Sequence, residues 1–166
     1  MVEVYKNIFI GSENDYYSIS NPQEWAVLHC CKNPFHCQFV GYRGNLPSAH
    51  PDYALKQIGN EMALNLVDMD KYSPNYLMFN KNMFETAFKF LDEYRQKGYK
   101  ILIHCNQGES RAPTLGMLYI AKLGAFNYKD FGATVEEFVS MYPDYNPKLN
   151  IYETVKNLWG YFVKNG

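Results

Sequence analysis

The sequence has few cysteines, no excess of charge and no long apolar run, and each absence excludes a class of protein. The four cysteines are Cys30, Cys31, Cys37 and Cys105, and their spacing is not that of a disulfide framework. The net charge is -1, so no general positive field attracts nucleic acid or an anionic membrane. No apolar stretch reaches membrane-spanning length, and the N-terminus does not resemble a signal peptide. We therefore expect a cytoplasmic protein with no nucleic-acid or membrane partner.

What the sequence has in quantity is apolar and aromatic side chains. Hydrophobic residues make up 47% and aromatic residues 17% of the 166 residues, which is enough to fill one hydrophobic core. No repeat, low-complexity tract or linker divides the chain. We expect a single domain over residues 1–166, acting as a monomer.

The spacing of apolar residues predicts strands that alternate with helices. The predicted strands are Val4–Ile10, Trp25–Cys31, Met62–Val67 and Tyr99–His104. The predicted helices are Asn82–Lys97, Ala112–Leu123, Lys129–Tyr142 and Pro147–Val163. The stretch 32–53 is rich in Pro, Gly and His and predicts an irregular insertion. This order predicts an α/β fold with a mostly parallel central sheet flanked by helices.

The segment HCNQGESR, residues 104–111, joins the last predicted strand to a predicted helix. A tight loop at a helix N-terminus presents backbone N–H groups to an anion, and Gly108 allows the backbone conformation that such a loop needs. The same N–H groups stabilise a thiolate at Cys105, and Arg111 is able to hold two phosphate oxygens. We expect Cys105 as nucleophile and Arg111 as phosphate clamp. The predicted substrate-binding residues are Asn106, Gln107, Gly108, Glu109, Ser110 and Arg111.

With the sequence HCNQGESRAP at 104–113, the chain resembles the protein tyrosine phosphatase superfamily, and within it the small dual-specificity branch. The segments VYKNIFIGS near the start, LNLVD at 64–68 and NMFETAFKFLDE before the last strand extend the resemblance. It implies a two-step reaction in which a thiolate attacks phosphorus, an Asp protonates the leaving oxygen, and water hydrolyses the phosphocysteine. It also implies that no metal or cofactor is needed.

Two aspartates follow the strand that carries the general acid in this family. Asp68 stands where the family pattern places the acid, and Asp70 lies two residues further on in the same loop. We favour Asp68 and keep Asp70 as the alternative. The chain between Asp68 and Cys105 is longer than in the family, and we expect the extra residues to lie within 71–81.

The residue after Arg111 departs from the family, which places Ser or Thr there. Ala112 lacks the hydroxyl that helps the phosphoenzyme break down, so the resemblance implies a slow second step, unless Ser110 or Thr114 substitutes. Loop positions Asn106, Gln107 and Glu109 carry no positive charge, which argues against a polyphosphorylated lipid substrate. We expect phosphorylated proteins, on tyrosine and on serine or threonine, or small phosphomonoesters.

Alternatives remain at this point. A non-catalytic phospho-binding module is one alternative, and a sulfur transferase or arsenate reductase, which also uses a Cys in an anion loop, is another. The early residues His29, Cys30, Cys31, His36 and Cys37, with His50 further on, are most simply packing residues. They also suggest a structural zinc site, or a thiol that protects Cys105 from oxidation, as in some members of the family.

Overall fold

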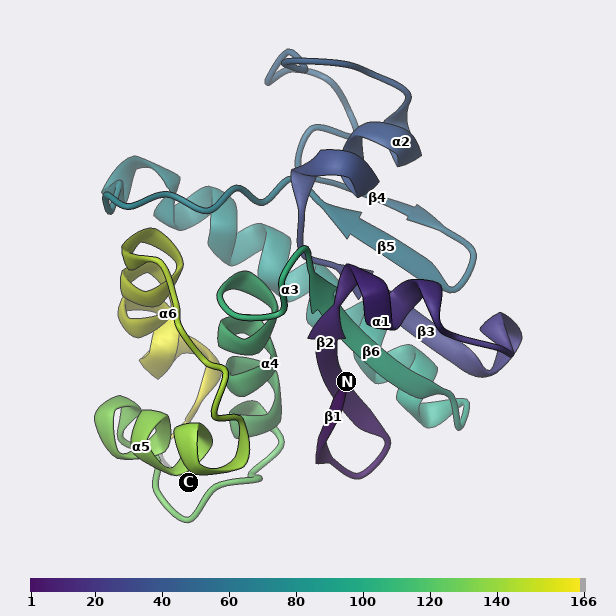
Figure 1. The fold of residues 1–166 in the computed structure, drawn as a ribbon. Coiled ribbons are helices and arrows are strands. Elements are labelled where there is room, and N and C mark those ends of the chain that lie inside the picture. The colour runs from purple at the N-terminus through teal and green to yellow at the C-terminus, as the bar shows by residue number, and fades with distance from the viewer. Residues whose placement is uncertain (165–166) are drawn as a thin grey trace.

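A six-stranded sheet forms the centre of the protein in the computed structural model, which describes residues 1–164 (Figure 1). The strands are β1 (Val2–Tyr5), β2 (Ile8–Ser12), β3 (Trp25–His29), β4 (Leu55–Ile58), β5 (Glu61–Leu64) and β6 (Lys100–Cys105). The helices are α1 (Glu13–Tyr17), α2 (Cys37–Val40), α3 (Leu77–Gln96), α4 (Arg111–Lys122), α5 (Phe131–Met141) and α6 (Leu149–Phe162). Within these residues, no helix is both long and apolar enough to cross a bilayer.

The strand order is β1-β2-β6-β3-β5-β4, and the four inner strands β2, β6, β3 and β5 run parallel. The two edge strands, β1 and β4, pair antiparallel with their neighbours. β6 is the strand that ends in Cys105, and it lies between β2 and β3 near the middle of the sheet. The prediction of a mostly parallel sheet flanked by helices is confirmed, with antiparallel edges added.

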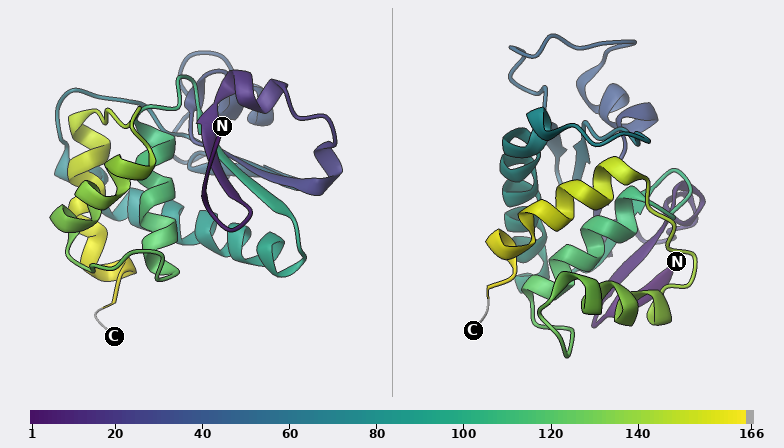
Figure 2. Two further views of the ribbon diagram at one scale, coloured as in Figure 1. Left: turned by 60° about the horizontal axis from the view of Figure 1, so that its bottom comes forward. Right: turned by 90° about the vertical axis from the view of Figure 1, so that its left-hand side faces the viewer.

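Helices cover both faces of the sheet, as the two views in Figure 2 show. α3 and α4 pack on one face, where the main core lies, and α5 and α6 pack against α4 on its outer side. The other face is covered by α1 and the short turns of residues 32–40, around a small cluster that includes Cys31, Phe35 and Ala63. The C-terminal half therefore supplies most of the apolar covering.

Three of the predicted element boundaries were wrong. Val4–Ile10 is two strands joined by a tight turn, because Asn7 adopts a positive φ of 59°, which asparagine tolerates better than most residues. The strand predicted at Met62–Val67 ends at Leu64, and the following residues leave the sheet. The helix predicted to begin at Asn82 begins at Leu77, so part of the expected insertion at 71–81 is helical.

The stretch 32–53 is irregular for most of its length, as predicted, but it begins with a π-helical turn at Lys32–His36 that leads into α2. The last strand and the three later helices match their predicted ranges to within two residues. These segments have long, strongly periodic apolar patterns, which explains why their positions were predicted well.

The loop after β6 packs against the end of β2. Gly108 has φ +76°, and a Cβ atom there would lie 2.8 Å from the carbonyl carbon and oxygen of Gly11. The neighbouring backbone is held as well, because Ser12 pairs with Cys105 in the sheet and the N–H of Glu13 donates to the carbonyl of Asn106 at 3.2 Å. Position 108 therefore requires glycine for two independent reasons, its backbone conformation and the contact with a neighbouring strand.

Gly108→Ala should destabilise the protein more than Gly124→Ala. Gly124 also has a positive φ of 82°, but a Cβ atom there meets nothing within 4 Å, so its substitution costs only backbone strain of about 1–2 kcal/mol. At Gly108 the backbone contact adds about 1–3 kcal/mol to that strain. Urea unfolding of both variants and the native chain measures the difference, and equal losses of stability would show that the contact with Gly11 is not a constraint.

Candidate active site

A cavity of about 390 Å³ opens at the carboxyl end of β6, the edge of a parallel sheet where ligands commonly bind. Cys105 lies in its wall and is only 2% exposed. The residues that line the cavity are Asp68, Cys105, Asn106, Gln107, Glu109, Ser110, Arg111, Asn146 and Lys148. All of the predicted catalytic residues and all of the predicted substrate-binding residues except Gly108 thus meet at one cavity.

The loop between β6 and α4 carries unpaired backbone donors. The N–H groups of Gln107, Gly108, Glu109 and Ser110 donate to no residue within 1–164. The loop's carbonyl groups, in contrast, are engaged: the hydroxyl of Tyr142 donates to the carbonyl of Gly108 at 2.6 Å. An anion site at a helix N-terminus requires a loop whose backbone N–H groups are free to donate to the anion. Here, hydrogen bonds to the loop's carbonyl groups hold it in place while its N–H groups stay free.

Arg111 is held over the cavity by hydrogen bonds to two other segments. Its Nη1 donates to the carbonyl of Leu66 at 3.1 Å, and its Nη2 donates to Oδ1 of Asn106 at 2.7 Å. Its Nε lies 3.2 Å from Oδ2 of Asp68, although this N–H makes no hydrogen bond within residues 1–164. A guanidinium group has five N–H donors, so three remain for an anion.

The structure separates the two candidate acids. Asp68 lies in the cavity, where its Oδ1 accepts from the hydroxyl of Ser110 at 2.8 Å and its Oδ2 faces Arg111. Asp70 lies outside the cavity, with a side chain 85% exposed and paired with Lys148 at 3.3 Å. Only Asp68 is placed beside the predicted nucleophile loop.

Neither neighbouring hydroxyl replaces the one that Ala112 lacks. The Ser110 hydroxyl donates to Asp68 and accepts from the backbone N–H of Lys148. The Thr114 hydroxyl donates to the carbonyl of Ser110 at 2.7 Å. Within residues 1–164, no hydroxyl donates to the sulfur of Cys105, and Ala112 itself is fully buried.

His104 belongs to a buried chain of polar side chains that the sequence did not predict. Nε2 of His104 lies 2.5 Å from Nδ1 of His29, and Nε2 of His29 lies 2.8 Å from Oε2 of Glu61. The hydroxyl of Tyr16 also donates to Glu61, and its ring stacks on His104. This series of contacts connects β6, β3, β5 and α1 directly behind Cys105. An isolated histidine or glutamate in the sequence gives no sign of it, because the partners lie far apart along the chain.

This chain of contacts fixes the protonation of His104. Burial by itself raises the pKa of Glu61, but the hydrogen bonds from His29 and Tyr16 hold that pKa below its ordinary value. The Glu61 carboxylate therefore accepts from Nε2 of His29, whose Nδ1 accepts in turn from Nε2 of His104. Burial, reinforced by the nearby His29, lowers the pKa of His104 to about 3. His104 is neutral near pH 7 and adds no positive charge beside Cys105.

His36 has partners of its own and takes no part in these contacts. His36 bonds to the hydroxyl of Tyr42 and the carbonyl of Asp52, both at 2.8 Å. Within residues 1–164, no three His, Cys, Asp or Glu side chains are placed to share a metal ion. Burial raises the pKa of Cys30 well above its ordinary value and that of Cys31 to about 12, so neither is a ready thiolate ligand.

Asn146 and Lys148 are cavity residues that sequence reasoning missed. They lie in the segment before α6, more than thirty residues after the loop, and the N–H of Asn146 donates to the carbonyl of Glu109 at 2.8 Å. Lys148 brings a positive charge to the mouth of a cavity whose loop has no lysine. The only signal in the sequence is the short polar stretch between two predicted helices, which is not specific.

The chain matches known proteins of one family. A family model described as "Dual specificity phosphatase, catalytic domain" matches residues 52–154. Human dual specificity protein phosphatase 5 is 45% identical over 47 residues, which are 28% of this chain and 12% of that protein. Tyrosine-protein phosphatase vhp-1 of Caenorhabditis elegans is 37% identical over 98 residues, 58% of this chain and 13% of that protein. The chain thus spans about an eighth of the length of these relatives.

Two further matches extend over most of the chain. Serine/threonine/tyrosine-interacting protein B of Xenopus laevis is 27% identical over 137 residues, 82% of this chain and 56% of that protein. The crystal structure of the human tyrosine phosphatase-like serine/threonine/tyrosine-interacting protein superposes with a TM-score of 0.62 at 20% identity, covering 96% of this chain and 95% of the other. At that identity the superposition shows a shared fold.

Proposed function

Because the chain belongs to the family of dual-specificity phosphatase catalytic domains, we propose that it hydrolyses phosphomonoesters through a phosphocysteine at Cys105. The observation that carries the proposal is the meeting of Cys105, Arg111 and Asp68 at one cavity, on a loop with four unpaired backbone N–H groups. Those donors, with Arg111, stabilise charge on the equatorial oxygens of the transferring phosphoryl group.

The proposed reaction has two steps. In the first, the Cys105 thiolate attacks phosphorus, the bond from phosphorus to the ester oxygen breaks, and Asp68 gives its proton to the leaving oxygen. In the second, Asp68 takes a proton from water, the water oxygen attacks phosphorus, and the sulfur–phosphorus bond breaks. Inorganic phosphate leaves and the thiolate is restored.

Arg111 links substrate binding to the position of the acid. Nε of Arg111 lies 3.2 Å from Oδ2 of Asp68. A phosphate in the cavity competes with Asp68 for the guanidinium group of Arg111, and the bidentate contact with phosphate is stronger than the contact with Asp68. Asp68 then turns from Arg111 toward the leaving oxygen, while Leu66 and Asn106 keep the guanidinium group in place.

The proposed substrates are phosphotyrosine and phosphoserine or phosphothreonine in proteins. The loop side chains Asn106, Gln107 and Glu109 offer no positive charge for additional phosphates, and among residues 1–164 Lys148 is the one lysine in the cavity wall. A monophosphorylated side chain suits this arrangement better than a polyphosphorylated lipid. All four cysteines are free thiols, which fits the proposed cytoplasmic location, and we propose that the domain acts as a monomer.

A non-catalytic phospho-binding module is the second candidate, and Ala112 is the observation that favours it. The Xenopus relative is likewise named as an interacting protein. The two candidates differ in one measurable property, release of the alcohol or phenol from a phosphomonoester.

The first test is a rapid-quench assay with p-nitrophenyl phosphate in EDTA, comparing the native chain, Cys105→Ser and Ala112→Ser. We expect the native chain to release about one equivalent of nitrophenol in a burst and then turn over slowly, because no hydroxyl assists the second step. Cys105→Ser should release none. Ala112→Ser should raise the steady rate by roughly tenfold, the effect of one hydrogen bond to a charged group. If the native chain releases no nitrophenol, the binding-module candidate replaces the phosphatase proposal.

Asp68→Asn and Asp70→Asn form a matched pair that tests the acid. Loss of a general acid lowers the rate of the first step, measured as the rate of the burst, by about 10²–10⁴-fold, and the loss should be larger for phenyl phosphate than for p-nitrophenyl phosphate, whose leaving group needs less help. Asp70→Asn should change neither rate by more than about twofold, because its side chain is exposed outside the cavity. Equal losses for both esters in Asp68→Asn would mean that this residue orients Arg111 and donates no proton.

A further inference from the structure

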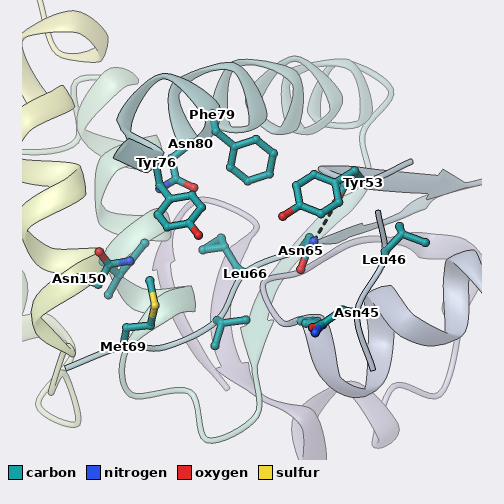
Figure 3. A pocket seen from close by; sticks show the side chains of 13 residues that line it. Asn45, Leu46, Tyr53, Asn65, Leu66, Met69, Tyr76, Phe79, Asn80 and Asn150 are labelled. Atoms are coloured by element: carbon teal, nitrogen blue, oxygen red, sulfur yellow. Dashed lines mark hydrogen bonds between the residues drawn. The ribbon is translucent and has the colours of Figure 1, made fainter. Parts of the chain in front are cut away.

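Figure 3 shows a second cavity. Its volume is about 220 Å³. Val67 and Met69 line it, and Asp68, which lies between them in the sequence, lines the first cavity, so the two cavities lie on either side of this segment.

Five parts of the chain meet at the second cavity: the turn that begins at Lys32, the loop that follows α2, the segment 65–69, the residues around the start of α3 and the start of α6. The first, second and fourth of these include residues from 32–53 and 71–81, where the sequence predicts insertions.

The lining of this second cavity is rich in amides and phenols. Asn80, Tyr76 and Tyr53 contribute from different elements, and within residues 1–164 no carboxylate lines the cavity. Asn80 is 7% exposed, and its side-chain amide makes no hydrogen bond with any residue in the described part of the chain, so its donor and acceptor groups are available to a partner in the cavity. A group there that both donates and accepts would form hydrogen bonds with this amide.

One lysine also lines the cavity, Lys32, whose Nζ donates to Oδ1 of Asn45 at 3.2 Å, and much of the remaining lining is apolar. Figure 3 shows Phe79 and Leu66 between the polar groups at the two ends of the cavity. A cavity of about 150 Å³ is large enough to hold benzene, so 220 Å³ has room for one aromatic ring with a polar substituent. Size and lining together favour a phenol: a flat apolar ring that ends in a group able to donate and to accept.

Segment 65–69 forms the wall between the two cavities, so a group bound in the second cavity contacts the segment that carries Asp68. Leu66 lines the second cavity, and its carbonyl accepts the hydrogen bond from Arg111. Val67 and Met69 also line it, and Asp68 stands between them. The carbonyl of Met69 is held by the N–H of Asn150 at 3.1 Å, so α6 supports the same wall. A ring packed against these residues would order the acid segment from behind.

We propose that the second cavity binds a tyrosine side chain of the protein substrate, close in sequence to the phosphorylated residue. The inference rests on the proposed phosphatase function and adds to it a determinant of substrate choice. Binding energy gained at a distance from the phosphate then serves to order Asp68 and Arg111, which is how remote contacts contribute to catalysis.

The test measures binding, so it does not depend on turnover. Fluorescein-labelled peptides of Ala and Gly carry one central phosphotyrosine, and a single unmodified Tyr is placed in turn at each position within four residues of it. Their Kd values are measured by anisotropy on Cys105→Ser protein. At one position or two neighbouring positions, Tyr should tighten binding by about tenfold over Ala, the gain expected for burying one aromatic ring. Phe at that position should gain less than Tyr.

Asn80→Leu and Asn82→Leu, each made in the Cys105→Ser protein, provide the matched comparison. Both residues lie on α3, but Asn82 is exposed and does not line the cavity. In Asn80→Leu the ratio of the Kd for the Ala peptide to that for the Tyr peptide should fall to the smaller ratio found with the Phe peptide, whereas Asn82→Leu should keep the native ratio. Tyr76→Ala should also lower the ratio. Because Tyr76 lies at an exposed position in the cavity wall, its replacement is less able to disrupt folding than a change at a buried residue.

Three results would overturn the inference. The first is that Tyr improves binding at no position, and the second is that the full improvement survives in both Asn80→Leu and Tyr76→Ala. The third is that free N-acetyltyrosinamide binds at the cavity while peptides show no preference. The last result would make the cavity an effector site. A different result would contradict the proposed phosphatase function: peptides with a central phosphotyrosine would bind no better than peptides with a central tyrosine.

Discussion

The loop from Cys105 to Arg111 keeps its shape because its backbone is pressed against the backbone of a neighbouring strand. At Gly108 there is no room for a side chain, since a Cβ atom would meet the Gly11 carbonyl at 2.8 Å. β6 lies between β2 and β3, so neither the strand nor the loop that follows it is free to shift. A fixed loop with unpaired N–H groups is preorganised for an anion, and preorganisation is what gives such donors their effect in catalysis.

The same packing explains which protein groups sit around the nucleophile. The parallel register places His29 beside His104, and this pairing lets Glu61, on the next strand, determine the tautomer of both rings. On the opposite side, Arg111 reaches back from α4 to the carbonyl of Leu66. The segment that carries Asp68 is therefore tied to Arg111, while the second cavity lies behind it. We see this segment, residues 65–69, as the element through which substrate contacts and chemistry influence one another.

Periodic apolar segments and the Cys-x5-Arg loop allowed much of this architecture to be predicted from the sequence. The buried strand before Cys105 and the helices after it have patterns long enough to locate within two residues. The hairpin at Asn7 was missed because one residue with positive φ interrupts an otherwise regular apolar pattern. Lys148, Glu61 and the second cavity were missed for a different reason: each depends on residues that meet only through the fold, and a single sequence carries no record of such contacts.

The central claim is that Cys105 itself carries the phosphoryl group between the two steps. Its most direct measurement is mass spectrometry of the native chain, quenched in acid within the first turnover of a phosphotyrosine peptide and then digested with protease. The account predicts one phosphoryl adduct, on Cys105, at nearly one equivalent per chain, because Ala112 leaves the second step slow. An enzyme that releases phosphate while no adduct forms on Cys105 would contradict the account.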